Sequence, residues 1–224
     1  MSQNQTKDQS LTSDLKILIV GKSGTGKTSF VNKWIKNEFT DSYKATIVSE
    51  FSSKLFLYEE KLYKINLWDI AGQDHFASIT KTFAKGSHGA ITLSDVMDPK
   101  SLNETTKWKK ALDESELFPD GGKLPNILIQ NKIDLIKGNE AKDMTSLREF
   151  SKQNKFDDCF KTSAKTGYNI NESIEKLLHI IIRRLNAISS KEMDLNRNSV
   201  SIDPEKSSDK DKYRTKQTGC CSPS

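Results

Sequence analysis

The chain has 224 residues, 34% of them hydrophobic, which favours one substantial domain with polar segments over two full domains. Its 35 basic and 30 acidic residues are interspersed and give a net charge of +5. Because nucleic-acid binders gather basic residues in a stripe, we expect no nucleic-acid partner. The three cysteines form neither a disulfide framework nor a metal-binding spacing, and no apolar run is long enough to cross a bilayer.

Strand and helix patterns alternate along most of the chain. The apolar run LKILIV ends at Gly21 and is typical of a buried strand. We predict strands over 15–20, 54–58, 63–69, 89–95, 126–131 and 156–162, and helices over 27–37, 101–117, 145–154 and 169–186. This alternation predicts an α/β fold with a mainly parallel six-stranded sheet and helices on both faces. Ligands of such folds bind where the strands end.

Composition divides the chain into four segments. We expect a disordered segment at 1–14, where no apolar signal-peptide core is present and Ser2 excludes N-myristoylation. The folded domain is expected at 15–186. Residues 187–219 are rich in Ser, Lys and Asp and cannot bury enough apolar surface to offset their ordering entropy, so they are expected to be a disordered tail. The last segment, 220–224, contains a cysteine pair.

The stretch GKSGTGKT at Gly21–Thr28 matches the phosphate-binding loop G-x-x-x-x-G-K-[ST], typical of P-loop NTPases. Its glycines let backbone amides turn toward phosphates at the positive end of a helix. Lys27 can reach the terminal phosphates, and the Thr28 hydroxyl can bind magnesium. The loop follows a predicted strand and precedes a predicted helix, which is the required context.

Three more polar motifs follow predicted strands. In DIAGQ, Asp69 can hold a metal through water, Gly72 can offer its amide to a phosphate, and Gln73 can orient the attacking water. NKID (131–134) and SAK (163–165) end two later strands. Each is an ordinary loop when taken alone, but their order and placement together point to a nucleotide site.

These motifs, together with Thr46 and the final cysteine pair, resemble the Rab family of Ras-like GTPases over about residues 15–185 and the last five. WDIAGQ and the long stretch ELFPDGGKLP are similar, more loosely, to the Rab subgroup associated with lysosome-related organelles. The resemblance implies a GTP-binding domain that hydrolyses GTP to GDP and phosphate with Mg²⁺.

The resemblance also implies roles for individual residues. Asn131 and Asp134 would read the guanine edge, Lys132 would pack along the base, and the Ala164 amide would meet the guanine oxygen. Phe39 would flank the base. Thr46 would join Thr28 and Asp69 around magnesium only when the third phosphate is present, and Gln73 would be catalytic. The full set implied to contact the nucleotide is Ser23, Gly24, Thr25, Gly26, Lys27, Thr28, Ser29, Phe39, Tyr43, Thr46, Gly72, Asn131, Lys132, Asp134, Ser163, Ala164 and Lys165.

Effector proteins of Rabs are similarly bound through an aromatic trio, which falls here on Phe51, Trp68 and Phe83. For Trp68, plain core packing is an equal alternative. Three departures from the family pattern, Val48 for glycine, His75 for arginine and Phe83 for tyrosine, leave the choice of partner open. We interpret His88 and Cys159 as structural.

The ending GCCSPS supports two interpretations. Cys221 begins a stretch with the length of a C-a-a-X box, but serine and proline replace its aliphatic pair. Cys220 and Cys221 instead resemble the Rab double-cysteine ending, which implies two geranylgeranyl groups. The implied protein is a monomer on the cytosolic face of an endomembrane, with a soluble pool. Its implied partners are an exchange factor, a GTPase-activating protein, effectors and a prenyl-chaperone.

Two other functions remain as alternatives. A nucleotide-locked binding module would recruit proteins without turnover, although Gln73 and Thr46 argue against it. An ATP-dependent small-molecule kinase would share the phosphate loop, but adenine offers no paired donors to Asp134.

Overall fold

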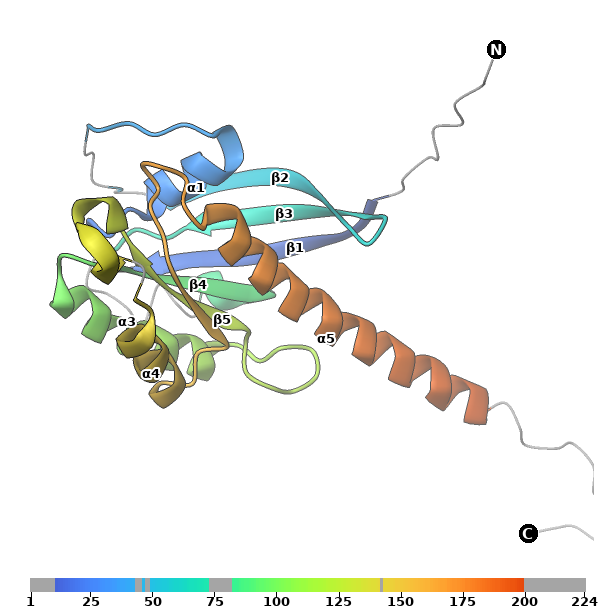
Figure 1. The fold of residues 1–224 in the computed structure, drawn as a ribbon. Helices are drawn as coiled ribbons and strands as arrows, with labels where there is room; N and C mark the ends of the chain where they lie inside the picture. Colours follow the sequence, from blue (N-terminus) through green and yellow to red (C-terminus); the bar gives the residue numbers. More distant parts are fainter. Residues whose placement is uncertain (1–10, 43–45, 47–48, 73–81, 142, 200–224) are drawn as a thin grey trace, which may run out of the picture. The chain divides into compact units, whose positions relative to one another are not determined.

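The strands form one sheet with the predicted architecture. The computed structural model describes residues 11–42, 46, 49–72, 82–141 and 143–199. Within them, the strands are β1 (Leu11–Gly21), β2 (Glu50–Tyr58), β3 (Lys61–Asp69), β4 (Gly89–Asp95), β5 (Asn126–Asn131) and β6 (Asp158–Lys161). Their order is β2-β3-β1-β4-β5-β6 (Figure 1). Strand β2 is antiparallel to β3, and the other neighbours are parallel. The predicted six-stranded, mainly parallel sheet is confirmed.

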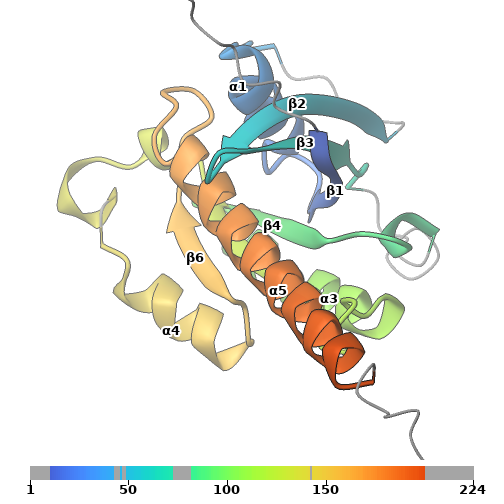
Figure 2. The same cartoon turned by 90° about the vertical axis from the view of Figure 1, so that its right-hand side faces the viewer.

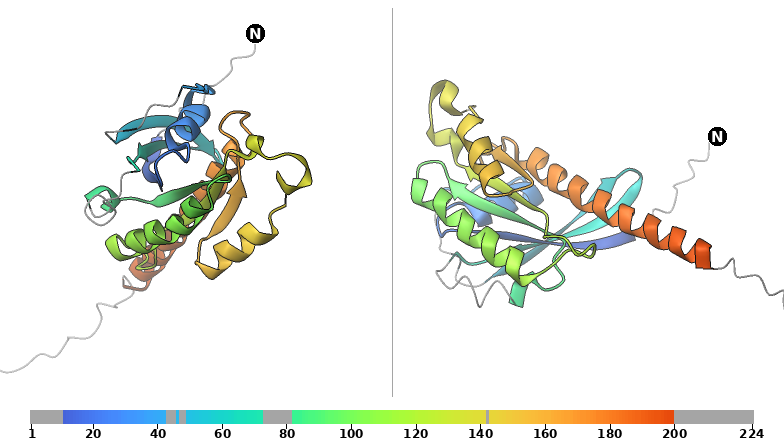
Figure 3. Two further views of the ribbon diagram at one scale, coloured as in Figure 1. Left: turned by 90° about the vertical axis from the view of Figure 1, so that its left-hand side faces the viewer. Right: turned by 90° about the horizontal axis from the view of Figure 1, so that it is seen from below.

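Helices cover both faces of the sheet. The α-helices are α1 (Lys27–Lys36), α3 (Pro99–Ser115), α4 (Thr145–Gln153) and α5 (Ile170–Ser199), with short 3-10 turns η1 (Ile133–Leu135) and η2 (Gly138–Ala141). On β2, Lys54 Nζ donates to the Trp34 carbonyl of α1 at 2.8 Å, and the Tyr58 hydroxyl bonds to His179 of α5. Helices α1 and α5 therefore cover the same face, whereas α3 lies on the other (Figures 2 and 3).

The core lies between these layers. The central residues of β1, β4 and β5 are mostly apolar and are buried, as expected for parallel strands that are covered on both faces of the sheet. Helix α5 contributes the face predicted from its spacing, namely Ile170, Ile174, Leu177, Leu178, Ile181 and Ile182, each no more than 2% exposed. A large buried area of this kind holds the strand ends rigid, and the site is built on those ends.

Two residues interpreted as structural are confirmed in that role. Cys159 packs with Leu128, Leu147 and Phe156, and burial raises the pKa of its thiol. His88 Nδ1 accepts the Lys16 backbone N–H at 3.1 Å, and burial lowers the pKa of the imidazole. Both side chains belong to the scaffold.

The outer elements differ from their predicted bounds. Strand β1 begins at Leu11, ahead of the predicted residue 15, because parallel pairing with β3 continues as far as Leu11 opposite Leu62. Helix α5 continues past the predicted end at 186 to Ser199, and Ile188 still packs against the core. The disordered segments predicted at 1–14 and 187–219 therefore overlap a strand at 11–14 and a helix at 187–199.

The chain divides into two compact units, Met1–Ile188 and Ser189–Ser224, and the contacts below lie within the first. No helix in the described part of the chain is both long and apolar enough to cross a membrane.

Candidate functional site

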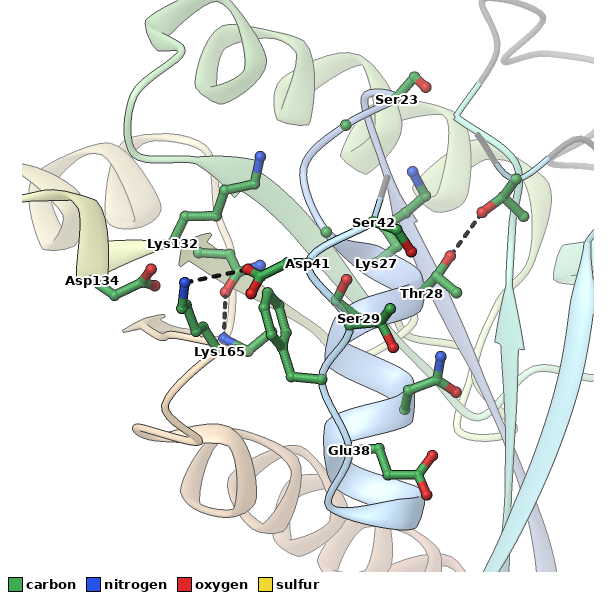
Figure 4. Close-up of a pocket in the computed structure, with 18 of the residues that line it drawn as sticks. Ser23, Lys27, Thr28, Ser29, Glu38, Asp41, Ser42, Lys132, Asp134 and Lys165 are labelled. Carbon is green, nitrogen blue, oxygen red and sulfur yellow. Dashed lines mark hydrogen bonds and ion pairs between the residues drawn. The ribbon is translucent and has the colours of Figure 1, made fainter. Parts of the chain in front are cut away.

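A cavity of about 530 Å³ lies where β1, β5 and β6 end, at the edge of the sheet predicted to bind a ligand (Figure 4). Its walls come from the loop between β1 and α1, the first turns of α1, residues 38–42, Thr46, Gly72, and the loops after β5 and β6. The lining residues are Ser23, Gly24, Gly26, Lys27, Thr28, Ser29, Asn32, Glu38, Phe39, Thr40, Asp41, Ser42, Thr46, Gly72, Asn131, Lys132, Asp134, Leu135, Ala164 and Lys165.

The phosphate loop forms one end of the cavity around a buried lysine. Lys27 Nζ donates to the carbonyl oxygens of Gly21 and Lys22, at 2.9 and 3.1 Å. Burial lowers the pKa of Lys27 to about 8, and the nearby Asp69 carboxylate partly opposes this shift. Gly26 has φ +88°, and a Cβ there would lie 2.6 Å from Asn131 Nδ2, so only glycine fits. A buried ammonium under a glycine-rich turn suits an anionic ligand.

Thr28, Thr46 and Asp69 meet beside Lys27. The hydroxyl of Thr28 lies 2.7 Å from that of Thr46 and donates to Asp69 Oδ2 at 2.5 Å. Burial raises the pKa of Asp69 to about 6, against the lowering effects of the Thr28 hydrogen bond and the Lys27 charge. Asp69 Oδ1 is buried with no hydrogen-bond partner among the described residues. Two hydroxyls and an unpaired carboxylate oxygen fit a hard divalent cation such as Mg²⁺, which prefers oxygen ligands.

Asn131 joins the loops at the opposite end of the cavity. Its Nδ2 donates to the Thr25 carbonyl at 3.0 Å, and its Oδ1 accepts from the Ala164 N–H at 3.1 Å. The Ala164 amide, expected to meet a base oxygen, is thus bonded to Asn131 in this structure. Asn131 holds the phosphate loop and the loop after β6 together.

The carboxylate of Asp134 lies at the same end and faces the cavity (Figure 4). Ser163 Oγ donates to Asp134 Oδ1 at 2.5 Å, which fixes the orientation of the carboxylate. Each carboxylate oxygen has two lone pairs, so both oxygens remain available as acceptors for the paired donors of a ligand. Ser163 itself is not among the residues that line the cavity, so it reaches a ligand only through Asp134.

Phe39 and Lys165 both line the cavity and lie close to each other. Lys165 Nζ lies 5.8 Å from the centroid of the Phe39 ring and 3.2 Å from Asp41 Oδ1 (Figure 4). Planar apolar and cationic groups of this kind suit the two faces of an aromatic base.

The aromatic trio lies outside the cavity. The ring centroids of Phe51 and Trp68 are 5.4 Å apart, and those of Trp68 and Phe83 are 5.9 Å apart. Phe51 is 54% exposed, whereas Trp68 and Phe83 are half-buried and pack against the core. Core packing therefore describes part of the environment of Trp68, and its role in an effector contact stays a prediction.

The structure brings together most of the residues named from the sequence. Thr25 contributes its carbonyl to Asn131 rather than lining the cavity. Six lining residues were not predicted, namely Asn32, Glu38, Thr40, Asp41, Ser42 and Leu135. Asn32 lies one helical turn after Thr28 and could have been found from that spacing. Several predicted residues lie outside the described part of the chain: Tyr43, Val48, Gln73, His75, Cys220 and Cys221.

A glycine-rich loop between a strand and a helix, a nearby cluster of two hydroxyls and a carboxylate, and the Asp134 carboxylate in the same cavity together define a P-loop nucleotide-binding protein. A family model described as the Ras family matches residues 16–183. Rab-32 of Mus musculus is 32% identical over 190 residues, covering 84% of this chain and 85% of that protein. Rab-7L1 of Homo sapiens is 32% identical over 75% of this chain and 82% of its own. Rab-32A of Dictyostelium discoideum is 35% identical over 82% of this chain and 85% of its own.

The chain therefore belongs to the Rab family of Ras-like small GTPases. It binds GTP and GDP and hydrolyses GTP to GDP and phosphate. The family predicted from the sequence motifs is confirmed, and the Rab-32 and Rab-7L1 relatives agree with the looser similarity to the Rab subgroup associated with lysosome-related organelles.

Proposed function

We propose that this GTPase hydrolyses GTP slowly and acts as a membrane-tethered switch that recruits effectors in vesicle trafficking. The observation that carries the proposal is the contact between Thr28, Thr46 and Asp69. Thr46 lies in the segment between α1 and β2, whereas Thr28 and Asp69 belong to the rigid scaffold. A ligand that adds a third phosphate and a cation at this point fixes that segment, and loss of the phosphate releases it.

Mg²⁺ is the proposed cofactor, held by the hydroxyls of Thr28 and Thr46 and, through water, by Asp69. When bound, it neutralises charge on the outer phosphates. Lys27 and the amides of the phosphate loop hold the same phosphates, and Gln73 orients the attacking water. No arginine lines the cavity among the described residues. We therefore propose that an activating protein supplies one or an equivalent group, worth roughly a thousandfold or more in rate.

The remaining implied partners are also proposals. Asp134 reads the guanine base, with Phe39 and Lys165 on its faces. Phe51, Trp68 and Phe83 form an effector contact, since their rings are contiguous and Phe51 is largely exposed. An exchange factor releases GDP, and a prenyl-chaperone carries the soluble monomeric form.

Geranylgeranyl groups on Cys220 and Cys221 are the proposed attachment to the cytosolic face of an endomembrane. A single lipid chain gives marginal and reversible attachment, so stable anchoring requires a second signal. The adjacent cysteines supply two chains, and the tail between the nucleotide-binding domain and these cysteines acts as the tether.

Single-turnover phosphate release from bound GTP, with and without cell extract, tests the switch. We expect slow release alone and a large acceleration with extract. Release that stays negligible in both conditions would favour the alternative of a nucleotide-locked binding module. A competition assay in which ATP displaces GDP as well as GTP does would favour the kinase alternative.

A further inference from the structure

The turn between β4 and α3, Asp95–Asp98, contacts both nucleotide loops from outside the cavity. The Val96 N–H donates to the Asn131 carbonyl at 3.0 Å. On either side of this bond, Asp95 and Asp98 form ion pairs with lysines of two different loops. None of the residues of the turn lines the cavity, so they act on a ligand only through the two loops that they contact. We call this turn the acidic brace.

One arm of the acidic brace holds the phosphate loop. Asp98 Oδ2 lies 2.9 Å from Lys22 Nζ, and Glu104 Oε1 of α3 lies 4.0 Å from the same nitrogen. The hydrogen bond from Lys22 lowers the pKa of Asp98. The Lys22 carbonyl accepts from Lys27 Nζ at 3.1 Å. Fixing Lys22 therefore fixes one of the two carbonyls that orient the phosphate-binding lysine.

The other arm holds the base loop. Asp95 Oδ2 lies 2.8 Å from Lys132 Nζ, with 14% and 34% of the two side chains exposed. Lys132 has φ +68°, a left-handed conformation that is costly for a residue with a side chain. The ion pair and the Val96–Asn131 bond hold this strained residue in place. Lys132 lies between Asn131 and the carboxylate of Asp134, so its position sets the geometry of the base pocket.

We propose that Asp95 and Asp98 are positioning residues that fix the phosphate loop and the base loop relative to each other, and that they slow nucleotide release. Both acids stand on one turn between a buried strand and a helix, so the spacing of the two lysines is set by rigid elements. The inference rests on the proposed assignment of the cavity ends to phosphate and base. The proposal gives a role in nucleotide release to two residues that do not line the cavity.

Asparagine variants of Asp95 and Asp98 remove the ion pairs and keep the hydrogen bonds that each aspartate makes to its own turn. Asp98 is the N-cap of α3, where its Oδ1 accepts the Lys100 N–H at 3.0 Å. Asparagine is an equally good N-cap, so Asp98→Asn keeps the helix start and removes the charge and the Oδ2 acceptor that pair with Lys22. Asp95→Asn likewise keeps an acceptor for the Met97 N–H, which bonds to Asp95 Oδ1 at 2.9 Å. Glu114→Gln is the matched control, because Glu114 pairs with Lys110 on the exposed face of the same helix.

The measurements are the release rate of a fluorescent GDP and the equilibrium affinities for GDP and GMP. We expect Asp98→Asn to speed GDP release about two- to fivefold. The effect is modest because the Lys22–Asp98 pair is partly exposed, and exposed ion pairs contribute little free energy. GMP lacks the second phosphate of GDP, which the phosphate loop is proposed to surround. The affinity of the Asp98→Asn protein for GMP should therefore equal that of the wild type. We expect Asp95→Asn to weaken GDP and GMP by the same factor, about three- to tenfold, because its pair is more buried. Glu114→Gln should match the wild type.

Lys22→Met, alone and combined with Asp98→Asn, supplies a second test that does not depend on the cap. The combined variant should release GDP no faster than the single variants, because all three lack the same pair. Wild-type release rates in both asparagine variants would overturn the proposal, as would additive effects of Lys22→Met and Asp98→Asn. Equal weakening of GDP and GMP by Asp98→Asn would also overturn it. A wild-type protein that binds GMP as tightly as GDP would instead refute the assignment of the cavity ends.

Discussion

Asp134 is the residue on which the choice of base depends. Its carboxylate is held by Ser163 and offers acceptors to paired donors. Asp134→Asn replaces one acceptor with a donor, which would face the imino donor of guanine. We predict a loss of guanine-nucleotide affinity of roughly 2–4 kcal/mol, measured by titration with fluorescent GDP.

Xanthine nucleotides provide the internal control for this substitution. They present an acceptor where guanine has its exocyclic amino donor, so the Asp134→Asn protein should gain relative affinity for them. A variant that bound GDP as tightly as the wild type would show that Asp134 does not read the base.

Thr28 and Gln73 are expected to act at different stages. Thr28→Asn removes a hydroxyl that bonds to both Asp69 and Thr46, so triphosphate binding should fall most. Gln73→Leu should keep the nucleotide bound and slow hydrolysis, because only the orientation of water is lost. Parallel titrations and single-turnover assays compare the two. Equal loss of binding in both variants would contradict this division of roles.

The residues that could be predicted from the sequence stand in short contiguous motifs at strand ends. Lys27, Thr28 and Asp134 are of this kind, since a local pattern fixes both their identity and their surroundings. Asp41 could not be predicted in the same way, because its approach to Lys165 depends on the course of the loop after α1. The pairing of Asn131 with the Thr25 carbonyl likewise joins residues distant in the chain and needs the folded sheet.

At the scale of elements, periodicity located every described strand and α-helix but not the short 3-10 helices η1 and η2, and several bounds differ. Strand β1 extends to Leu11 because its neighbour β3 offers a partner, and a single-strand pattern does not contain that information. Helix α5 extends because Leu185 and Ile188 continue its core face and good helix formers follow. Pairing with β3 therefore sets the start of β1, and packing against the core carries α5 as far as Ile188.

Arg184 of α5 fixes the long stretch between α3 and β5. Its guanidinium bonds to Asp120 and to the Lys123 carbonyl, and it lies 4.1 Å from the centroid of the Phe118 ring. Arg184→Met keeps much of the apolar stem and removes these contacts. We predict a loss of about 1–2 kcal/mol in the free energy of unfolding, measured by urea denaturation.

A nucleotide-binding measurement tests whether these contacts of Arg184 contribute only to stability. GDP affinity of the Arg184→Met protein should equal that of the wild type, since Arg184 does not line the cavity. A large fall in GDP affinity would show that the stretch between α3 and β5 also supports the site.

At the scale of the whole molecule, attachment and nucleotide binding should be separable. Cys220→Ser combined with Cys221→Ser should make the protein fully cytosolic, because both proposed lipid attachment points are lost. GDP binding should survive, since the cavity is built from residues 23–165. Either single variant should stay partly membrane-bound but mislocalised. Membrane fractionation of the double variant tests this prediction. Persistent membrane attachment would show that the anchor lies elsewhere.

The central claim is that the third phosphate fixes the segment around Thr46 against Thr28 and Asp69. Amide hydrogen exchange of the region Phe39–Asp69, compared between GDP and a non-hydrolysable GTP analogue with Mg²⁺, tests it most directly. We predict clearly slower exchange around Thr46 with the triphosphate and little change in β2 and β3, which the sheet already holds. Identical exchange around Thr46 with the two nucleotides would contradict the account.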